Sequence, residues 1–299
     1  MDATRGNPKD RQASFRVRSK FFAPPPEFDG CFTTFYHLSL EVDHGATVSD
    51  HLQPEWGNIR FFAGSLPSAQ VGDSHLAGSR FTASGPSSKP AYFEIGSAQM
   101  WGIGFLPLGW ARFVGRNAED YCNRACNGER EEAFRKFARL TGPLCEEDAG
   151  KQAQYEAIAQ AMRELMQPTR DDETILRVHK IMVDPAVTSV ATFSERSELS
   201  VRSLERLCRR YFGFAPKLLL RRQRFMRSLA TFMLDPSGNW TDAMDDHYHD
   251  QAQFTREFRD FMGMSPTAYA ALDHPILASF VEARARMWGS AAQTLDKPG

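Results

Sequence analysis

The chain has 299 residues, of which 42% are apolar and 24% are charged, and its formal net charge is −1. This length fits two ordinary globular domains, and the near-zero net charge argues against a uniformly basic nucleic-acid binder. The sequence has no apolar run of about 18 residues that would span a membrane, and its charged N-terminus lacks the apolar stretch of a secretory signal. The 5 cysteines are an odd number without framework spacing, so we expect a protein of the reducing cytoplasm.

The N-terminal part of the chain divides into three segments. Residues 1–20 are polar and mildly basic, and we expect them to form a flexible arm. Residues 21–128 are rich in aromatic and β-branched residues and are interrupted by turn clusters such as Gly72-Asp73-Ser74, which predicts a β-rich domain, either a cupin-like barrel or a sandwich. Residues 129–184 carry apolar side chains at helical spacing until Asp184-Pro185 ends the pattern, which predicts connecting helices.

Two patterns in these segments could indicate chemistry. A metal-binding cupin needs three or four ligands that converge on one ion, and the available histidines lack the required spacing: His37, His44, His51 and His75. Cys122 and Cys126 are close to a thiol pair at helical spacing. A redox sensor would need a lowered thiol pKa and solvent access, which Arg124 and Arg130 could favour, but ordinary half-buried cysteines are the simpler interpretation. The chain also lacks a Gly-rich dinucleotide loop, a Walker loop and a nucleophile elbow, so we expect no catalytic residues, no metal, no cofactor and no enzyme.

Aromatic side chains gather in the first half of the chain, and two interpretations of them stay open. They could line a cavity for a small-molecule effector, or they could fill a closed core, since barrel interiors are packed by such side chains in either case. The residues concerned are Phe22, Phe32, Phe35, Tyr36, Trp56, Phe61, Phe62, Tyr92, Phe93, Trp101 and Phe105. The effector and the residues that would bind it are therefore left unknown.

Two similar helical segments follow, one from Ser194 to Pro216 and the other from Asp245 to Pro266. In each, a polar cap starts a helix with one apolar stripe, and a Gly-x-x-Pro sequence ends it. After the cap Ser200 the stripe is Leu204, Leu207, Cys208 and Tyr211, with Arg202, Arg206 and Arg209 opposite; after the cap Asp250 it is Phe254, Phe258 and Phe261, with Ala252, Gln253, Arg256 and Arg259 outward. Helices of this kind are typical of the recognition helices of DNA-binding proteins.

The spacing and the charge of the two segments support this interpretation. Leu218 to Leu234 is predicted to be one helix, whose length approaches the roughly 34 Å between successive major-groove faces of a duplex. From Arg196 to Arg227 ten basic residues face two acidic ones, a balance of 10 − 2 = +8, whereas from Ser228 to Ala270 the balance is 2 − 7 = −5. Since phosphate contacts supply much of the affinity for DNA, we expect the first unit to dominate binding.

The segment from Val187 to Leu272 resembles the double helix-turn-helix domain of the AraC/XylS family of transcription regulators. The matching residues include Leu204-Glu205-Arg206-Leu207, Gly213-x-x-Pro216, Phe254-Thr255-Arg256-Glu257-Phe258 and Gly263-x-Ser265-Pro266. More narrowly, the segments Leu52–Phe62 and Ile103–Gly115 and the turn Ser84-Gly85-Pro86 are similar to the N-terminal domain of a poorly characterised AraC subgroup. In the turn of the second unit the family has Gly where this chain has His247; a left-handed turn residue other than Gly costs about 1 kcal/mol, so we expect this unit to be less well formed or differently angled.

The resemblance implies an α+β protein, with a β-rich domain over residues 21–128 for sensing or dimerisation, connecting helices over 129–184, and an all-α DNA-binding domain over 185–272. Residues 273–299 form a C-terminal helix and tail, and the amphipathic helix is expected to dock on its own domain. The residues expected to contact DNA are Ser200, Arg202, Ser203, Arg206, Arg209, Arg210, Gln251, Gln253, Thr255, Arg256 and Arg259. Further partners are RNA polymerase, a small-molecule effector and a second copy of the chain, with no membrane. The competing hypothesis is a cupin-like binding protein or enzyme whose DNA-binding domain has degenerated.

Overall fold

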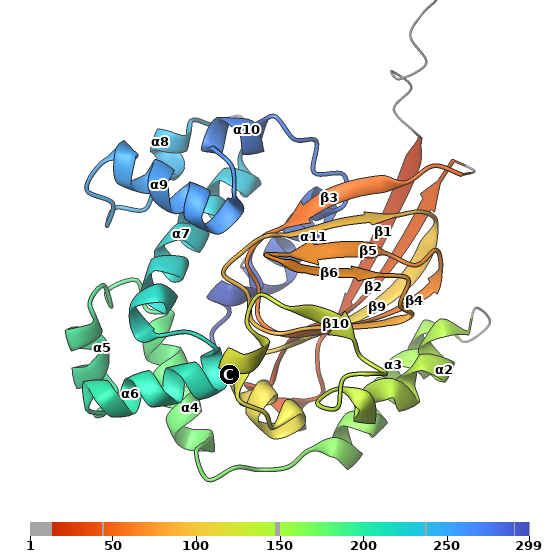
Figure 1. Cartoon of the computed structure of the whole chain (residues 1–299), viewed down its shortest axis with the longest axis horizontal. Coiled ribbons are helices and arrows are strands. Elements are labelled where there is room, and N and C mark those ends of the chain that lie inside the picture. The colour runs from red at the N-terminus through yellow and green to blue at the C-terminus, as the bar shows by residue number, and fades with distance from the viewer. Residues whose placement is uncertain (1–13, 44, 147–149, 237, 290, 299) are drawn as a thin grey trace, which may run out of the picture.

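The structure is a computed structural model that describes residues 14–43, 45–146, 150–236, 238–289 and 291–298, and Figure 1 shows a β-rich body with helices beside it. Within these ranges the strands form two antiparallel sheets, with the orders β1-β2-β9-β4-β7-β10 and β3-β8-β5-β6. The strands are β1 (Phe15–Phe22), β2 (Phe32–Val42), β3 (Val48–Leu52), β4 (Asn58–Gly64), β5 (Ser68–Val71), β6 (Ser74–Ala77), β7 (Phe81–Ser84), β8 (Ala91–Ile95), β9 (Ala98–Phe105) and β10 (Ala125–Asn127). The predicted combination of a β-rich N-terminal part and a helical C-terminal part is confirmed.

The central strands of the larger sheet, such as β2 and β9, are buried on both faces. In β2, Tyr36 and Leu38 point to the interior between the two sheets, where Val48 and Ile95 of the smaller sheet join the same core. Phe35 points to the outer face, which a second core covers. Because successive side chains of a strand alternate between the two faces, a strand buried on both sides has the near-continuous apolar sequence seen in β2.

Short turns and helices cover the outer face of the larger sheet. They are η1 (Pro26–Phe28), α1 (Pro107–Gly109), η2 (Trp110–Val114), η3 (Ala118–Tyr121), η4 (Arg135–Leu140), α2 (Thr141–Cys145), α3 (Lys151–Leu165) and α4 (Asp172–Met182). The predicted connecting helices differ from the structure at their start, because η4 is a 3-10 helix. Phe134 and Phe137 are both buried there, and residues three apart share one side of a 3-10 turn.

Part of the expected flexible arm is a β-strand. Residues 1–13 of the expected flexible arm lie outside the described residues, and residues 15–20 belong to β1, which pairs with β2 from Phe15↔Val42 to Phe22↔Phe35. The polar side chains of this stretch are those of an edge strand, whose outer side faces solvent.

The C-terminal helices belong to two different cores. They are α5 (Val190–Arg196), α6 (Val201–Leu207), its continuation η5 (Cys208–Phe212), α7 (Pro216–Leu234), α8 (Trp240–Ala243), α9 (Gln251–Met262), α10 (Pro266–Ala270), α11 (Leu277–Trp288) and η6 (Gln293–Leu295). Leu204 and Cys208 of the first unit are part of the core that covers the larger sheet, whereas Phe254 and Phe258 of the second unit belong to a separate core. The first unit is therefore fixed on the body, and α7 carries the second unit away from it (Figure 1).

The C-terminal tail corrects another expectation. The helix α11 does not dock on the DNA-binding part alone, because it also packs against β1 and β3 of the β-rich body. Ile276, which precedes the first turn of α11, lies in the interior core with Phe21 and Tyr36, so burial of its apolar side chain helps to hold the helix on the body. None of the helices within the described ranges is long and apolar enough to cross a membrane.

Candidate nucleic-acid interface and ligand cavity

The first helix-turn-helix unit consists of α5, a short turn and α6. The turn contains Glu198 at φ 55°, and Ser194 closes it by donating its hydroxyl to the carbonyl of Leu199 at 2.5 Å. Ser200 then caps α6 by accepting the backbone N–H of Ser203 at 3.2 Å, which satisfies one of the unpaired donors at a helix start. The cap and the buried stripe predicted from the sequence are thus present, with Leu204 and Cys208 fully buried.

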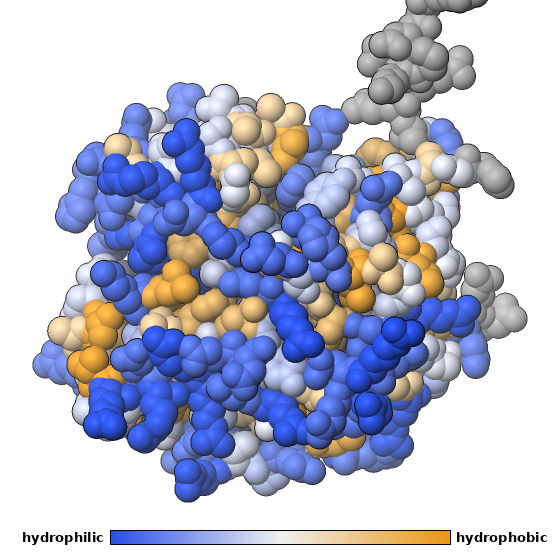
Figure 2. All heavy atoms as spheres, viewed as in Figure 1, coloured by the Kyte–Doolittle hydropathy of each residue, from blue (hydrophilic) through white to orange (hydrophobic). Residues whose placement is uncertain are grey.

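The outward face of α6 presents arginines in two different states. Arg202, Arg206 and Arg210 are exposed, and no acidic partner holds them within the described residues. Arg209, by contrast, pairs with Glu119 of the body and with Glu205 one turn earlier, the latter at 3.0 Å. The surface over α6 is mainly hydrophilic (Figure 2). Arg209 is therefore already engaged, whereas the other three arginines are available to a phosphate or a base edge.

The second unit consists of α8, a turn and α9. Asp250 caps α9 by accepting the N–H of Gln253 at 2.6 Å, as predicted. Gln253 in turn accepts the backbone N–H of His249 at 3.0 Å, and Gln251 donates to the Thr241 hydroxyl at 2.9 Å. Both glutamines therefore have local partners that DNA would have to replace. Outward on α9, Arg256 and Arg259 are exposed, and Thr255 is half-buried beside them.

The turn of the second unit differs from the left-handed geometry that the family glycine would give. His247 is not among the described non-glycine residues with positive φ, which are Asn123, Glu198 and His274. Its backbone N–H and its Nδ1 both contact Asp245 Oδ1, at 3.0 and 2.9 Å. Asp245 thus takes over the local stabilisation of the turn, and the strain expected for a left-handed His247 does not arise.

The acidic residues of the second unit bind arginines of α7. Glu257 is buried and accepts Arg221 Nε at 2.8 Å, Arg224 Nη2 at 2.7 Å and the Tyr248 hydroxyl at 2.9 Å. Asp260 and Asp245 pair in the same way with Arg221 and Arg227. Three arginines counted in the +8 balance are therefore paired with three of the seven acidic residues of the second unit, so the charge excess read from the sequence is larger than the charge offered to DNA.

Arg222 of α7 also points away from solvent. Its side chain is fully buried, with the guanidinium carbon 4.0 Å from the centre of the Trp56 ring and Nη1 donating to Ser87 O at 2.9 Å. Burial lowers the pKa of Arg222 to about 9. This arginine joins α7 to the body through a cation–π contact, so it belongs to the interface between the two parts of the chain.

A groove of about 540 Å³ lies beside the first recognition helix. Arg206, Arg209 and Arg210 line it, together with Arg116 and Arg170 from outside the helix-turn-helix units. Glu119 and Asp171 also contribute to its walls. Sequence reasoning missed Arg116 and Arg170, because nothing in their local sequence indicates that the fold brings them to α6.

Comparison with known proteins assigns the helical part. Residues 193–271 match the family model described as "Helix-turn-helix domain". These residues are an AraC-type helix-turn-helix domain. Domains of this type bind DNA, and the chain is a DNA-binding transcription regulator. The family resemblance predicted from the sequence motifs is confirmed, and the matched domain is one found in transcription regulators.

The solved structures that match the chain share little sequence identity with it. A variant of ToxT from Vibrio cholerae, crystallised without ligand, is 11% identical, with coverage of 86% of this chain and 97% of that chain and a TM-score of 0.43. ToxT with a bound unsaturated fatty acid is 10% identical, with coverage of 87% and 95% and a TM-score of 0.39. The AraC-like activator CuxR is 11% identical, with coverage of 69% and 84% and a TM-score of 0.26. No curated protein matches the chain.

The β-rich body encloses a cavity of about 130 Å³ between its two sheets. Of the eleven aromatic residues noted in the sequence, Tyr36, Phe62 and Phe93 line it, and Phe21 and Phe280 join them. A Cβ at Gly102 would lie 2.0 Å from the ring of Tyr36, so this glycine gives the ring its place on the cavity floor.

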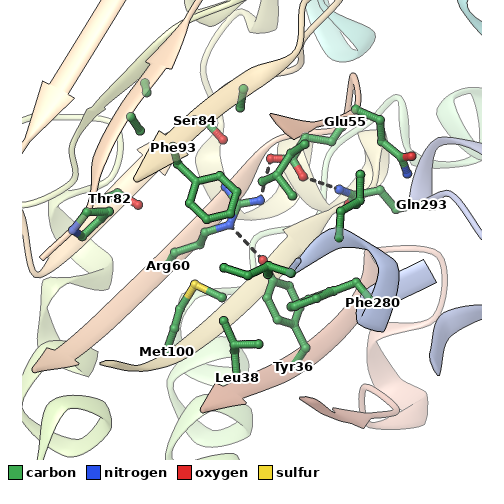
Figure 3. Close-up of a pocket in the computed structure, with 18 of the residues that line it drawn as sticks. Tyr36, Leu38, Glu55, Arg60, Thr82, Ser84, Phe93, Met100, Phe280 and Gln293 are labelled. Atoms are coloured by element: carbon green, nitrogen blue, oxygen red, sulfur yellow. Dashed lines mark hydrogen bonds and ion pairs between the residues drawn. The ribbon is translucent and has the colours of Figure 1, made fainter. Parts of the chain in front are cut away.

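A polar network occupies one end of the cavity (Figure 3). Arg60 donates Nη2 to Glu55 Oε1 at 2.6 Å and Nε to the Tyr36 hydroxyl at 2.9 Å, and Gln293 donates Nε2 to Glu55 Oε2 at 2.6 Å. Burial alone would lower the pKa of Arg60, but Glu55 outweighs it and raises the pKa above the ordinary value. Burial raises the pKa of Tyr36, so its hydroxyl stays protonated. The network is thus charged but internally neutral.

Among the described residues, the histidines and cysteines considered for a metal or redox site lie apart or have other partners. His37 is buried, with Nε2 hydrogen-bonded to Gln99 Oε1 at 3.2 Å, and His44 lies outside the described residues. Within those residues no three potential ligands gather at one point. Burial raises the pKa of the Cys122 and Cys126 thiols to about 12, which leaves both thiols protonated at neutral pH.

Proposed function

We propose that this regulator reads two successive major grooves on one side of a duplex and that a small molecule in the cavity of the β-rich body controls it. The observation that carries the DNA part is that both recognition helices expose arginines, while Glu257, Asp260 and Asp245 of the second unit are paired with arginines of α7. The 19 residues of α7 make a connector of about 28 Å, which suits the roughly 34 Å spacing of groove faces.

The residues proposed to contact DNA are those of the two outward faces. They are Ser200, Arg202, Ser203, Arg206, Arg209 and Arg210 of the first unit, and Gln251, Gln253, Thr255, Arg256 and Arg259 of the second. Among them, Arg202 and Arg206 are proposed to reach base edges, since arginine reads guanine by a bidentate contact. Contacts to RNA polymerase and to a second copy of the chain, expected from the resemblance, are part of the same proposal.

The size and charge of the cavity define the class of effector. A cavity of about 130 Å³ is close to the roughly 150 Å³ that accommodates benzene. The charged side chains on its wall already have partners, Arg60 with Glu55 and Arg284 with Asp296, so an uncharged ligand fits best. Gln53 Oε1 and Ser84 Oγ line the cavity, are buried and have no hydrogen-bond partner within the described residues. We therefore propose a small, apolar, uncharged effector with one hydroxyl group, of the size of a phenol.

Phenol, toluene and benzoate test this class, because they share a ring and differ in one substituent. Phenol should raise the melting temperature and bind more tightly than toluene, and benzoate should not bind. Ser84→Ala should weaken the binding of phenol by about 0.5–1.5 kcal/mol, the usual net contribution of one hydrogen bond, and should leave the binding of toluene unchanged. Equal binding of all three compounds, or of none, contradicts the proposed effector class.

A further inference from the structure

The C-terminal strap, defined as residues 273–289 and 291–296, runs from the second helix-turn-helix unit back to the β-rich body. After α10 the chain turns at His274, which has φ 45°, and α11 then crosses beside β1 and β3 (Figure 1). The residues after α11 pack against α7 through η6. The strap thus contacts the body, the connector and the second unit.

Both ends of the strap are held by side chains of other elements. At its start, the buried carboxylate of Asp50 on β3 accepts the backbone N–H groups of Ile276 and Leu277 through Oδ2, at 2.9 and 2.7 Å. These two hydrogen bonds are charge-assisted, and the negative carboxylate also interacts favourably with the positive end of the helix dipole. Near its end, Gln223 of α7 donates to Thr294 O at 2.8 Å.

The strap is also a wall of the cavity. Ile276, Leu277, Phe280, Val281, Ala291 and Gln293 line it. Phe280 meets the rings of Phe21 and Tyr36 edge-on, with centroids 5.4 and 5.2 Å apart, and Figure 3 shows Phe280 and Gln293 beside the polar network. A ligand in the cavity would therefore touch the strap as well as the sheets.

One residue connects the anchored start of the strap to the second unit. The ring of His274 lies 4.3 Å from that of Tyr269, and its two nitrogens approach Tyr269 O at 3.2 Å and Asp50 Oδ1 at 3.3 Å. Tyr269 is fully buried in the core of the second unit, against Trp240 and Phe258. A strap that leaves Asp50 would remove this support from the second unit.

We propose that the C-terminal strap couples occupancy of the cavity to the position of the second helix-turn-helix unit. This inference rests on the proposed effector site and names how that site is regulated. A ligand that contacts Leu277 and Phe280 binds the docked strap better than the released one, so it shifts the population toward docking. The docked strap fixes His274 against Tyr269, and thereby holds α9 in the orientation seen in the structure.

Hydrogen exchange and DNA affinity of the full chain test the coupling, with phenol as the ligand probe and a duplex selected by the wild-type protein from a random pool. Asp50→Asn removes the charge at the strap anchor, and Phe280→Ala removes the ring contact. Both variants should speed amide exchange in α11. Both should also lower the affinities for phenol and for the duplex about tenfold, which is within the usual range of coupling between sites. The control Asp43→Asn makes the same change at an exposed carboxylate, whose Oδ2 accepts the backbone N–H of Ser14 at 3.0 Å. It should leave the exchange of α11 and both affinities unchanged.

The outcomes separate this inference from the proposed function. Phenol should slow exchange in both α11 and α9 of the wild type. Phenol that binds but leaves α11 exchange unchanged overturns the coupling, while the effector site stands. Faster α11 exchange in both variants with unchanged duplex affinity also overturns it. Phenol that fails to bind the wild type contradicts the proposed effector class, and with it the inference.

Discussion

Replacement of Glu257 by alanine tests whether the second unit is held together by internal ion pairs. The carboxylate is 6% exposed and accepts bonds from Arg221, Arg224 and Tyr248. Glu257→Ala leaves Arg224, which is 18% exposed, without its acidic partner, and leaves the buried Tyr248 hydroxyl without an acceptor. Arg221 keeps Asp260.

The expected loss follows from these contacts. Removal of one partner from a buried ion pair costs about 3–5 kcal/mol, and a buried hydroxyl left unpaired costs about 1–3 kcal/mol. The cost is reduced because water reaches Arg221 and, in part, Arg224, and because Arg221 keeps Asp260 as a second acidic partner. We therefore expect the free energy of opening of the second unit to fall by about 3 kcal/mol.

Hydrogen exchange resolved along the chain is the appropriate assay, because the second unit has a core of its own and can open locally. Exchange in α9 should rise steeply in Glu257→Ala, while α4 and β2 should keep wild-type protection. The control is Asp260→Ala, whose carboxylate is 60% exposed and which should cost less than about 1 kcal/mol. A loss below about 1 kcal/mol for Glu257→Ala as well would refute the role of this carboxylate as the centre of the unit.

The remaining predictions concern DNA affinity, the turn and pH. Arg206→Ala should cost about 1–3 kcal/mol of specific binding, whereas Arg209→Ala should cost less than about 1 kcal/mol because two glutamates already hold this arginine; a mobility-shift titration that ranks them in reverse would contradict the arrangement. His247→Gly should lower stability by about 0.5–1 kcal/mol in a thermal melt, since the residue lies outside the left-handed region and glycine adds unfolded-state entropy; a gain would indicate strain there. Burial lowers the pKa of His37 to about 4 and that of His179 to about 3. Only the unfolded chain takes up these protons below about pH 6.5, so stability should fall from pH 6.5 toward pH 4, and His179→Phe should reduce this slope.

The local features of the helix-turn-helix units could be predicted from the sequence because they depend on neighbours along the chain. A cap such as Ser200 or Asp250 acts on the residue three positions later, and an apolar stripe repeats within one helix. The family motifs are built on the same short-range pattern, and the matched segment 193–271 confirms them.

The cavity and the charge distribution could not be predicted in the same way, since both depend on contacts between distant residues. Gln293 donates to Glu55, which lies 238 residues earlier in the sequence, and nothing in the local sequence of either residue indicates the pair. The +8 balance includes the basic residues of α7, yet Arg221 turns to the second unit and Arg222 to the body. A charge balance along the sequence therefore cannot show which face of α7 each arginine occupies.

The central claim is that α6 and α9 contact neighbouring major grooves, and a methylation-interference footprint tests it most directly. With a duplex selected by the wild-type protein, we expect two contacted patches about one helical turn apart. Arg206→Ala should remove one patch and Arg256→Ala the other, while Arg163→Ala, which loses only an ion pair with Glu27 on the body, should keep both. A wild-type protein that gives only one patch, or an Arg256→Ala variant that keeps both, would contradict the account.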